Sequence, residues 1–451
     1  MRNAWIPYAE KNAPRYTSYP TAAQFSDSIT SSNVSEWAQA IPPQKPISLY
    51  VHVPFCEQLC WYCGCHTTIP NGYDRISRYF QTLMKEIDLV ASNLGSYEGV
   101  SHLHFGGGTP NALSDEDMLT LLDKLRRAFK VLDDAEVAIE LDPRTLNLQM
   151  IRSLAAGGVS RASLGVQDFD GKVQRTVNRV QPFELVKQSV EWLRNWEIKD
   201  INFDLLYGLP FQTPETVKET ALKAIELQPD RISAFGYAHI PWFAKHQKAI
   251  DGSALPNLHQ RFDLYHIISE TLVQNDYIAI GLDHFAKKSD PLSTALTEKR
   301  LQRNFQGYTD DTCDTLIALG PSGISELPAG FCQNEKNIKL WTEHIERGNL
   351  SITRGVAINR DDALRREVIS ELMCYLEVDF GIICEKYGFP VEYLDESLTQ
   401  LQALSMDGLC YVARRKITVP ETARIMLRSV AQTFDKHYQL QSANQRHAKA
   451  V

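Results

Sequence analysis

The chain has 451 residues, of which 43% are hydrophobic and 23% are charged, and its formal net charge is −8 at pH 7. This composition is typical of a globular protein long enough for a barrel-sized domain and one or two smaller ones. The negative charge argues against a nucleic-acid partner held by bulk electrostatics. No apolar run approaches the length of a membrane span, and residues 1–16 lack the apolar core of a signal peptide, so we expect a cytoplasmic protein with no membrane partner.

Six segments rich in β-branched or aromatic residues are expected to form strands: residues 48–53, 100–105, 136–141, 161–166, 201–206 and 231–236. Amphipathic segments such as residues 73–94 and 213–228 lie between them and are expected to be helices. This alternation predicts parallel strands joined by right-handed crossovers. Because a closed barrel of this type has eight units, we predict an α/β fold in which residues 45–358 form an open (β/α)6 partial TIM barrel with an N-terminal extension.

A separate, mainly helical domain is predicted over residues 359–436. Apolar residues recur there at every fourth position, as in a buried helix face: Leu364, Val368, Leu372 and Leu376. A β-rich stretch at 409–419 and a further helix over 418–434 make the region similar to a winged helix. The basic residues 414–416 are too few for nucleic-acid binding, so we expect a lid over the site. Residues 437–451 are expected to be a flexible polar tail.

Three cysteines, Cys56, Cys60 and Cys63, form a C-x3-C-x2-C pattern directly after the first predicted strand. Three thiolates on one loop can hold three corners of a four-iron four-sulfur (4Fe-4S) cluster and leave the fourth iron open. A zinc site needs a fourth ligand, which Cys65 or His66 could in principle provide. The spacing is typical of radical S-adenosylmethionine (SAM) enzymes, in which SAM chelates the open iron and is cleaved to methionine and a 5′-deoxyadenosyl radical.

Polar residues follow the other predicted strands at the same end of the barrel. Tyr50 precedes the cysteines, the glycine-rich turn 106–110 follows the second strand, and the next three strands end near Glu140, Gln167 and Asp204. Acid and amide groups at successive strand ends suit a ribose, an adenine and an aminoacyl group. Each could instead be a satisfied buried polar group. Their place on one rim with the cysteines favours the functional interpretation.

The chain resembles the oxygen-independent coproporphyrinogen III oxidases (coproporphyrinogen dehydrogenases) over almost its full length. The specific elements are PRYTSYPTA (14–22), PFC-x3-C-x2-C-G-C, HFGGGTP, IELDPR, LGVQDF, VNRVQ, DLLYGLP, YAHIP, GLDHFA and RNFQGYT. Cys65 and RNFQGYT distinguish this branch from the related heme-chaperone branch. The resemblance implies that Cys56, Cys60 and Cys63 ligate the 4Fe-4S cluster, that Cys65 lies nearby without being a ligand, and that two SAM molecules bind.

The positions around the cluster-bound SAM are implied to be Tyr50, Gly107, Glu140 and Ile324. Those around the second SAM are implied to be Tyr62, Gly108, Thr109, Gln167, Arg179, Asp204 and Ala238. The implied reaction is the oxidative decarboxylation of two propionates of coproporphyrinogen III to vinyl groups, giving protoporphyrinogen IX without dioxygen. An electron donor such as a flavodoxin or ferredoxin system is implied as a partner, and we expect a monomer.

Residues 1–44 are expected to cap the substrate, a tetracarboxylate that an acidic protein must attract with local positive charge. Arg15 lies in the motif PRYTSYP, and a guanidinium can hold a carboxylate through two hydrogen bonds. Arg15 is therefore the candidate substrate contact, unless it only anchors the segment to the barrel. Two other functions remain open: a heme chaperone with a vestigial cluster, and a radical SAM methyltransferase or cyclopropane-forming enzyme.

Overall fold

The computed structural model describes residues 1–440, 449 and 450. Its centre is a twelve-stranded sheet in which all six predicted strands are present. They are β1 (Ile47–Val53), β2 (Val100–Gly107), β3 (Val131–Leu141), β4 (Arg161–Gln167), β5 (Asp200–Tyr207) and β6 (Arg231–Gly236). They lie side by side in chain order and every neighbouring pair is parallel. The prediction of a parallel (β/α)6 unit is therefore confirmed.

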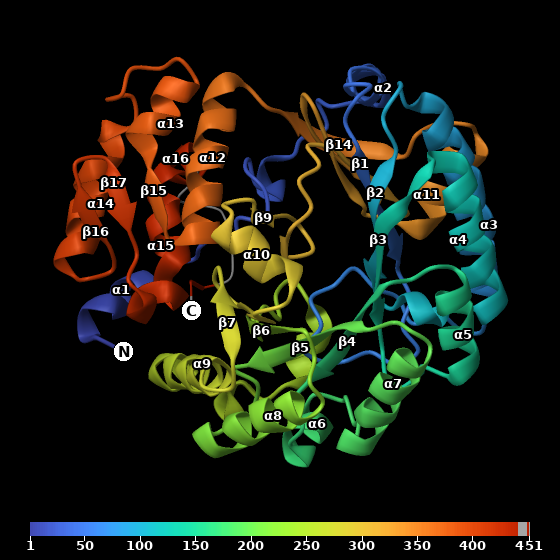
Figure 1. Ribbon diagram of the computed structural model, residues 1–451, viewed down its shortest axis with the longest axis horizontal. Helices are drawn as coiled ribbons and strands as arrows, with labels where there is room; N and C mark the ends of the chain where they lie inside the picture. Colours follow the sequence, from blue (N-terminus) through green and yellow to red (C-terminus); the bar gives the residue numbers. More distant parts are fainter. Residues whose placement is uncertain (441–448, 451) are drawn as a thin grey trace.

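Helices cover the outer face of this sheet (Figure 1). They are α3 (Asp74–Asn93), α4 (Asp115–Phe129), α5 (Leu148–Ala156), α6 (Gly171–Thr176), α7 (Phe183–Asn195) and α8 (Pro214–Glu226). Strand β5 shows why the sheet has an apolar and a polar face. Ile201, Phe203 and Leu205 are fully buried, whereas the alternating Asn202 and Asp204 are only partly buried. Because successive side chains point to opposite faces, polar groups line the inside of the barrel and apolar ones contact the helices.

The sheet continues beyond the six predicted strands at both edges. Strand β11 (Leu316–Leu319) is parallel to β1, and β12 (Ile324–Leu327), β13 (Gly330–Asn334) and β14 (Ile352–Ala357) follow it as antiparallel strands. At the other edge, β8 (His284–Lys287) is antiparallel to β6, and β7 (Tyr277–Ile280) pairs with β8. In the described part of the chain, β14 and β7 end the sheet without pairing with each other. The barrel is therefore open, as predicted.

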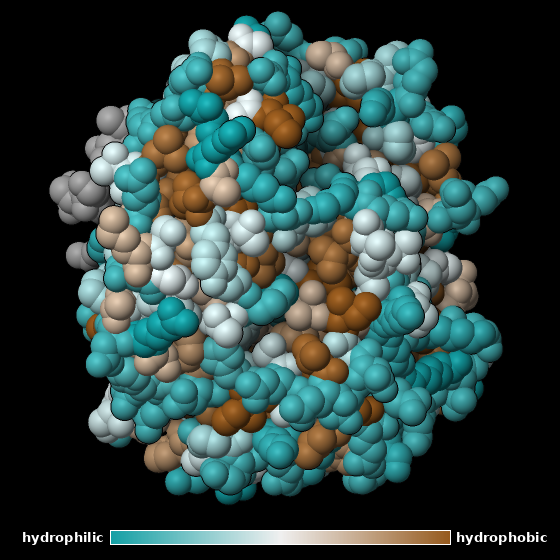
Figure 2. Space-filling model, turned by 60° about the vertical axis from the view of Figure 1, so that its left-hand side comes forward, coloured by the Kyte–Doolittle hydropathy of each residue, from teal (hydrophilic) through white to brown (hydrophobic). Residues whose placement is uncertain are grey.

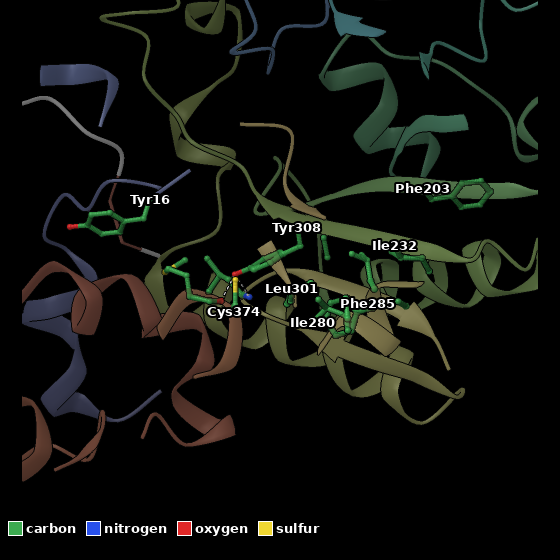
Figure 3. Packing of buried hydrophobic residues seen from close by; sticks show 14 of the residues in the cluster. Tyr16, Phe203, Ile232, Ile280, Phe285, Leu301, Tyr308 and Cys374 are labelled. Carbon is green, nitrogen blue, oxygen red and sulfur yellow. Dashed lines mark hydrogen bonds between the residues drawn. The ribbon is translucent and has the colours of Figure 1, made fainter. Parts of the chain in front are cut away.

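The segments between these edge strands add α9 (Leu258–Val273), α10 (Pro291–Thr297), α11 (Ile338–Glu346) and the small hairpin of β9 (Gln302–Arg303) and β10 (Tyr308–Thr309). Tyr308 connects the barrel to the C-terminal domain. Its hydroxyl donates to the carbonyl of Met373 at 2.6 Å and accepts from the amide of Leu282 at 2.9 Å. Figure 3 shows its ring beside Cys374, between the barrel core around Phe285 and the C-terminal helices.

The C-terminal domain combines helices with a small antiparallel sheet in the order β15-β17-β16, which agrees with the winged-helix-like prediction. Its elements are α12 (Arg360–Tyr375), β15 (Glu377–Asp379), α13 (Phe380–Lys386), α14 (Leu398–Met406), β16 (Tyr411–Ala413), β17 (Lys416–Thr418), α15 (Leu427–Ala431) and α16 (Lys436–Leu440). The continuous helix predicted over 418–434 is wrong. Extended Pro420 precedes a 3-10 turn over Glu421–Met426, and α15 starts only at Leu427. Arg424 in that turn donates to the carbonyl of Gly281 in the barrel.

The N-terminal segment contacts both parts of the protein: α1 (Ile6–Ala9) lies beside the C-terminal domain, whereas α2 (Ser31–Gln39) packs against α3 and β12 of the barrel. Trp5 is buried, its ring contacts that of Phe262 of α9 at a tilt of 57°, and its indole nitrogen donates to the carbonyl of Asp407. Figure 1 shows the two ends of the chain close together. On the face shown in Figure 2, hydrophobic side chains gather around a central hollow with hydrophilic ones around it. Within the described residues, no helix combines the length and apolar character needed to cross a membrane.

The flexible tail predicted over residues 437–451 contacts the rest of the protein where the structure describes it. The helix α16 includes residues 437–440, and Nε2 of His437 pairs with Oδ1 of Asp362 at 3.0 Å. Lys449 forms a bridge with Asn12, and the buried Ala450 donates its amide to the carbonyl of Lys11 at 2.8 Å. The rest of the predicted tail, residues 441–448 and 451, lies outside the described residues.

Candidate active site

The cysteine loop follows β1 and closes on itself. The amide of Cys56 donates to the carbonyl of Thr68 at 3.2 Å, and the amide of Thr68 donates to that of Pro54 at 2.8 Å. Cys60 is buried, Cys56 and Cys63 are half-buried, and Cys65 is exposed. The amide of Cys65 lies 3.4 Å from the sulfur of Cys63, so Cys65 contributes a backbone N–H to a neighbouring thiol.

The thiols of Cys56, Cys60 and Cys63 fit a multinuclear cluster better than a single zinc ion. Zinc with bonds of about 2.3 Å to sulfur would hold its ligand atoms within roughly 4 Å of one another. Among the described residues, three potential metal ligands have their ligand atoms within 4.8 Å of one another: His102, Asp311 and Cys313. The thiols of the cysteine loop do not all lie that close together. The loop therefore suits the wider spacing of a 4Fe-4S cluster.

Two arginines donate to the sulfur of Cys60. Nη2 of Arg144 and Nη1 of Arg179 each lie 3.4 Å from its Sγ. Both guanidinium groups also pair with Asp142, Arg144 at 2.6 Å and Arg179 at 3.3 Å. Although burial raises the pKa of Asp142, the charges of Arg179 and Arg144 lower it below its ordinary value. Two positive charges and one carboxylate thus leave a net positive environment beside the sulfur of Cys60.

The glycines of the 106–110 turn allow close approach between β2, β3 and the cysteine loop. A Cβ atom at Gly106 would lie 2.7 Å from Oε1 of Glu140, and one at Gly108 would lie 2.5 Å from the carbonyl oxygen of Phe55. Gly107 has a φ of +118°, which favours glycine. The amides of Gly108 and Thr109 donate to the carbonyls of Val53 at 2.8 Å and Phe55 at 2.7 Å.

The amides of Gly108 and Thr109 therefore hold the cysteine loop in place and are not available to a ligand. The hydroxyl of Thr109 is also engaged, because it donates to Asn111 and accepts from the amide of Asp142. Thr109 is buried. Carbonyl groups and the Cα atoms of the glycines remain as the means by which this turn could contact a ligand.

The side chain of Glu140, at the end of β3, is held by its neighbours on β2. It accepts from Nε2 of His104 at 3.1 Å, and its other oxygen accepts from the amide of Gly107 at 3.4 Å. The ring of His104 stacks on Tyr50 of β1, with centroids 5.9 Å apart. The hydroxyl of Tyr50 pairs with Nδ1 of His52 at 3.1 Å. Tyr50, Gly107 and Glu140 are therefore brought together directly beside the cysteine loop.

Asp204 on β5 belongs to a polar group further along the rim. Its carboxylate accepts from the hydroxyl of Ser163 at 3.2 Å and from the amide of Asn202 at 3.0 Å. Burial and the negative charge of Glu140 raise the pKa of Asp204 to about 6. Gln167, at the end of β4, has a φ of +67°, a left-handed conformation that turns the chain at this rim. Both residues lie where the sequence predicted them.

Tyr62 and Ala238 are brought together by Gln247, whose side-chain amide donates to both carbonyls, at 3.0 and 3.3 Å. Nε2 of His246 pairs with the carbonyl of Cys63 at 2.7 Å. The segment after β6 thus packs on the cysteine loop. Ile324 begins β12, which is separated from β1 by β11.

Sequence reasoning missed several residues that shape the cysteine loop. Asp142 and Arg144 contact Cys60 or its partners, and Asn178 donates to the carbonyl of Leu59 at 2.9 Å. These residues belong to the motifs IELDPR and VNRVQ, in which the family resemblance implied roles for Glu140 and Arg179 alone. Arg15 is exposed, and its carbonyl accepts from Nη2 of Arg303 at 3.4 Å. It therefore lies beside the barrel and away from the described contacts of the cysteine loop.

Comparison with known proteins agrees with this geometry. The profile of the radical SAM superfamily matches residues 50–224. The chain is 44% identical to the oxygen-independent coproporphyrinogen III oxidase of Bradyrhizobium diazoefficiens, over 99% of both chains. It is 37% identical to the enzyme of that name from Escherichia coli, over 98% of this chain and 96% of the relative. The solved structure of coproporphyrinogen III oxidase from Escherichia coli, a radical SAM enzyme, superposes with a TM-score of 0.90 at 38% identity, over 94% of this chain and 97% of that one. The chain therefore belongs to the family of oxygen-independent coproporphyrinogen III oxidases, within the radical SAM superfamily.

Proposed function

We propose that this chain converts coproporphyrinogen III to protoporphyrinogen IX by decarboxylating two propionate side chains to vinyl groups without dioxygen. The observation that carries this proposal is the loop of Cys56, Cys60 and Cys63 at the open rim of the barrel, beside Glu140 and in a net positive environment. Full-length similarity to enzymes that bear the name of this activity supports the substrate. The reaction places the protein in porphyrin and heme biosynthesis.

When bound, the 4Fe-4S cluster and SAM supply one electron and a 5′-deoxyadenosyl radical that removes a hydrogen atom from the β-carbon of a propionate. The substrate then gives up one electron to an external acceptor and releases carbon dioxide, which leaves the alkene. The chain's own contribution is to hold and orient these groups. Cys56, Cys60 and Cys63 hold the cluster, while Arg144 and Arg179 donate N–H groups toward the thiolate of Cys60.

Two SAM sites are part of the proposal. Around the first, Tyr50, Gly107 and Glu140 form one connected group, and the side chain of Glu140 is 38% exposed, so its carboxylate can accept from an amino group. Ile324 is assigned to this site by the family pattern alone. The second site would use Gln167 and Asp204 on the neighbouring strand ends. A carboxylate suits the two hydroxyls of a ribose.

The other residues assigned to the second SAM have fewer polar groups left to offer it. Tyr62 and Ala238 share Gln247 as a partner, so they can form one wall of a site. Gly108 and Thr109 would act through carbonyl groups, because their amides are engaged. Arg179 donates to Cys60, Asp142 and the carbonyl of Gly165. Its Nε is buried and has no hydrogen-bond partner.

The proposed partners are coproporphyrinogen III and an electron donor such as a flavodoxin or ferredoxin system, and the proposed working form is a cytoplasmic monomer. Arg15 is proposed to contact a substrate carboxylate. Its exposed side chain and its position next to Arg303 support this role. The N-terminal segment is proposed to cap the substrate, as its packing across α9 and the C-terminal domain would allow.

An anaerobic assay of the reconstituted protein tests the function. Protein loaded with iron and sulfide is mixed with SAM, a chemical reductant, an electron acceptor and coproporphyrinogen III, and the products are oxidised and analysed by mass spectrometry. The proposal predicts a product that has lost two carboxyl groups, together with 5′-deoxyadenosine. A product that has gained mass would indicate a methyltransferase or cyclopropane-forming enzyme. Stoichiometric heme binding without any turnover would indicate a heme chaperone.

A further inference from the structure

Three arginines that lie far apart in the sequence meet beside the carboxyl ends of β5 and β6. Arg261 lies on α9, Arg303 in β9 and Arg428 on α15. A Cβ atom at Gly208, directly after β5, would lie 2.3 Å from Nη1 of Arg261, and Cζ of Arg261 lies 5.9 Å from the centroid of the Tyr207 ring. The guanidinium of Arg261 therefore reaches the rim on which the functional side chains of the barrel lie.

The other two guanidinium groups belong to the same surroundings. Nη1 of Arg303 lies 3.8 Å from Oδ1 of Asp283. Burial and the charges of Arg15 and Arg303 lower the pKa of Arg428 to about 10, against the opposing effects of Tyr207 and Asp283. Because Tyr207 also borders Arg261, these residues form one basic group, which we call the arginine cluster: Arg261, Arg303 and Arg428.

The arginine cluster retains buried N–H groups that have no hydrogen-bond partner. Nε of all three arginines is buried and unpaired, and so is Nη1 of Arg303, whose side chain is only 5% exposed. Leaving the N–H groups of a buried cation unpaired is costly, and native proteins rarely do so without a reason. A carboxylate is the natural partner, because its two oxygens match the fork of a guanidinium.

The region around the arginine cluster also carries an excess of positive charge. Arg15 adds a fourth guanidinium from the N-terminal segment, and the carboxylate of Asp283 opposes the charges of Arg15, Arg303 and Arg428. Burial raises the pKa of Asp283, but the hydrogen bond from His284 and the charges of Arg303 and Arg15 lower it to about 2, so it stays ionised. One carboxylate cannot balance four guanidinium groups, and the surroundings favour additional anions.

We propose that the arginine cluster binds the carboxylates of those propionates of coproporphyrinogen III that are not being decarboxylated. This inference rests on the function proposed above and adds the site that recognises the substrate. The substrate carries four carboxylates on an apolar macrocycle, and the cluster draws its arginines from the barrel, the β9–β10 hairpin and the C-terminal domain. Binding would therefore also join these three parts of the protein.

The reacting propionate is expected to lie elsewhere, on the side of the Cys56–Cys63 loop. An ion pair stabilises a carboxylate before it reacts, and that stabilisation is lost as carbon dioxide leaves, so holding the reacting group in the cluster would slow the reaction. The sheet order agrees with this division. Strands β1 to β3 carry the cysteine loop and Glu140, whereas the cluster lies beside β5 and β6.

The test measures binding of coproporphyrin III, the stable and fluorescent oxidised form of the substrate, to the reconstituted full-length protein. Arg261→Gln and Arg303→Gln are each expected to raise Kd roughly 10- to 100-fold, because each removes charge-assisted hydrogen bonds. Iron content and SAM binding should not change. Arg428 is less suitable for substitution, because it also donates to the carbonyls of Ala13, Lys449 and Ala450.

Arg161→Gln is the matched control. The side chain of Arg161 is 6% exposed and its two Nη atoms are also unpaired, but Glu136 and Asp290 balance its charge at the start of β4. The inference predicts normal coproporphyrin binding in this variant. Normal affinity in folded Arg261→Gln and Arg303→Gln would overturn it, and so would a loss of turnover in those variants with unchanged affinity.

A measurement on the unmodified protein covers the case in which the variants do not fold. Coproporphyrin III tetramethyl ester, which has no carboxylates, should bind at least roughly tenfold more weakly than the free acid. Equal affinity would contradict the inference. The two proposals can fail separately: carboxylate-dependent binding without formation of protoporphyrinogen IX refutes only the proposed function, and turnover with carboxylate-independent binding refutes only the arginine cluster as a substrate site.

Discussion

Arg179 lies behind Cys60, with its Nη1 3.4 Å from the cysteine sulfur and 3.3 Å from Oδ2 of Asp142. The family pattern assigns Arg179 to a SAM molecule, but its Nη1 and Nη2 already donate to Cys60, Asp142 and the carbonyl of Gly165. Arg144 approaches the same sulfur from the neighbouring strand end. This arrangement makes the two arginines positioning residues for Cys60, in addition to any contact that they make with SAM.

We therefore predict that Arg144→Met makes the reduction potential of the reconstituted cluster more negative. Hydrogen bonds and positive charge beside a thiolate ligand favour the reduced, more negative cluster, and the variant removes both. A spectroelectrochemical titration measures the potential. Arg126→Met is the control, because Arg126 donates to the carbonyl of Gly157. An unchanged potential in Arg144→Met would show that this arginine has no electronic role.

Substituting the cysteines should separate ligands from neighbours. Cys56→Ser, Cys60→Ser and Cys63→Ser should each lose the cluster and all SAM cleavage, because a serine hydroxyl is a poor substitute for a thiolate. Cys65→Ser should retain a normal cluster, since Cys65 is exposed and contributes a backbone amide to Cys63. Iron and sulfide content and the electron paramagnetic resonance spectrum measure this. A cluster absent from Cys65→Ser alone would refute the three-ligand assignment.

The raised pKa of Asp204, about 6, predicts a pH dependence of SAM binding. The side chain is a carboxylate above that pH and a neutral acid below it, and only the carboxylate accepts from both hydroxyls of a ribose. Affinity at the second site should therefore fall as the pH drops below about 6, which equilibrium dialysis can measure between about pH 5 and about pH 8. The stoichiometry at saturation should be two SAM per chain.

Asp204→Asn should weaken this second site roughly 10- to 100-fold at neutral pH and remove its pH dependence, while the iron content stays normal. The first site, beside Glu140, should be unaffected. A saturated stoichiometry of one SAM in the unmodified protein would remove the second site, and an Asp204→Asn variant that keeps the pH dependence would assign it to another group.

Arg15→Ala is predicted to abolish or strongly reduce decarboxylation while leaving the cluster and SAM binding intact, because it removes an exposed guanidinium beside Arg303. Lys11→Ala is the control, since Lys11 is an exposed cation in the same segment. The two are compared by turnover of coproporphyrinogen III and by thermal stability. Equal turnover in both variants would return substrate recognition to the barrel and the arginine cluster.

A deletion of residues 1–22 would test the role of Arg15 less clearly than the Arg15→Ala variant. Trp5, Tyr16 and Tyr19 are buried, and the hydroxyl of Tyr16 donates to Asp435 at 3.0 Å. Removing these side chains would open the core between the N-terminal segment and the C-terminal domain, and each large aromatic residue costs about 3–5 kcal/mol when it is lost. The deletion would therefore combine a loss of stability with any loss of substrate binding.

The barrel strands and the cysteine loop could be predicted because their signals are local. Each of β1 to β6 is a short apolar run, and the spacing of Cys56, Cys60 and Cys63 lies within eight residues of sequence. The edge strands were not predicted. Strands β7, β8, β11 and β12 have only four residues each, and pairing within the sheet, which the sequence does not reveal, stabilises such short segments.

The amino-acid sequence by itself determined the parallel barrel, the cysteine loop and the family. The tertiary structure decided which atoms are available. It engaged the amides of Gly108 and Thr109 with the cysteine loop and directed Arg179 to Cys60. It also brought together Arg261, Arg303 and Arg428, which no spacing in the sequence connects. A buried hydrogen-bond donor binds the acceptor that lies next to it in the folded protein. The chemistry of each polar residue therefore depends on contacts between segments that lie far apart in the chain.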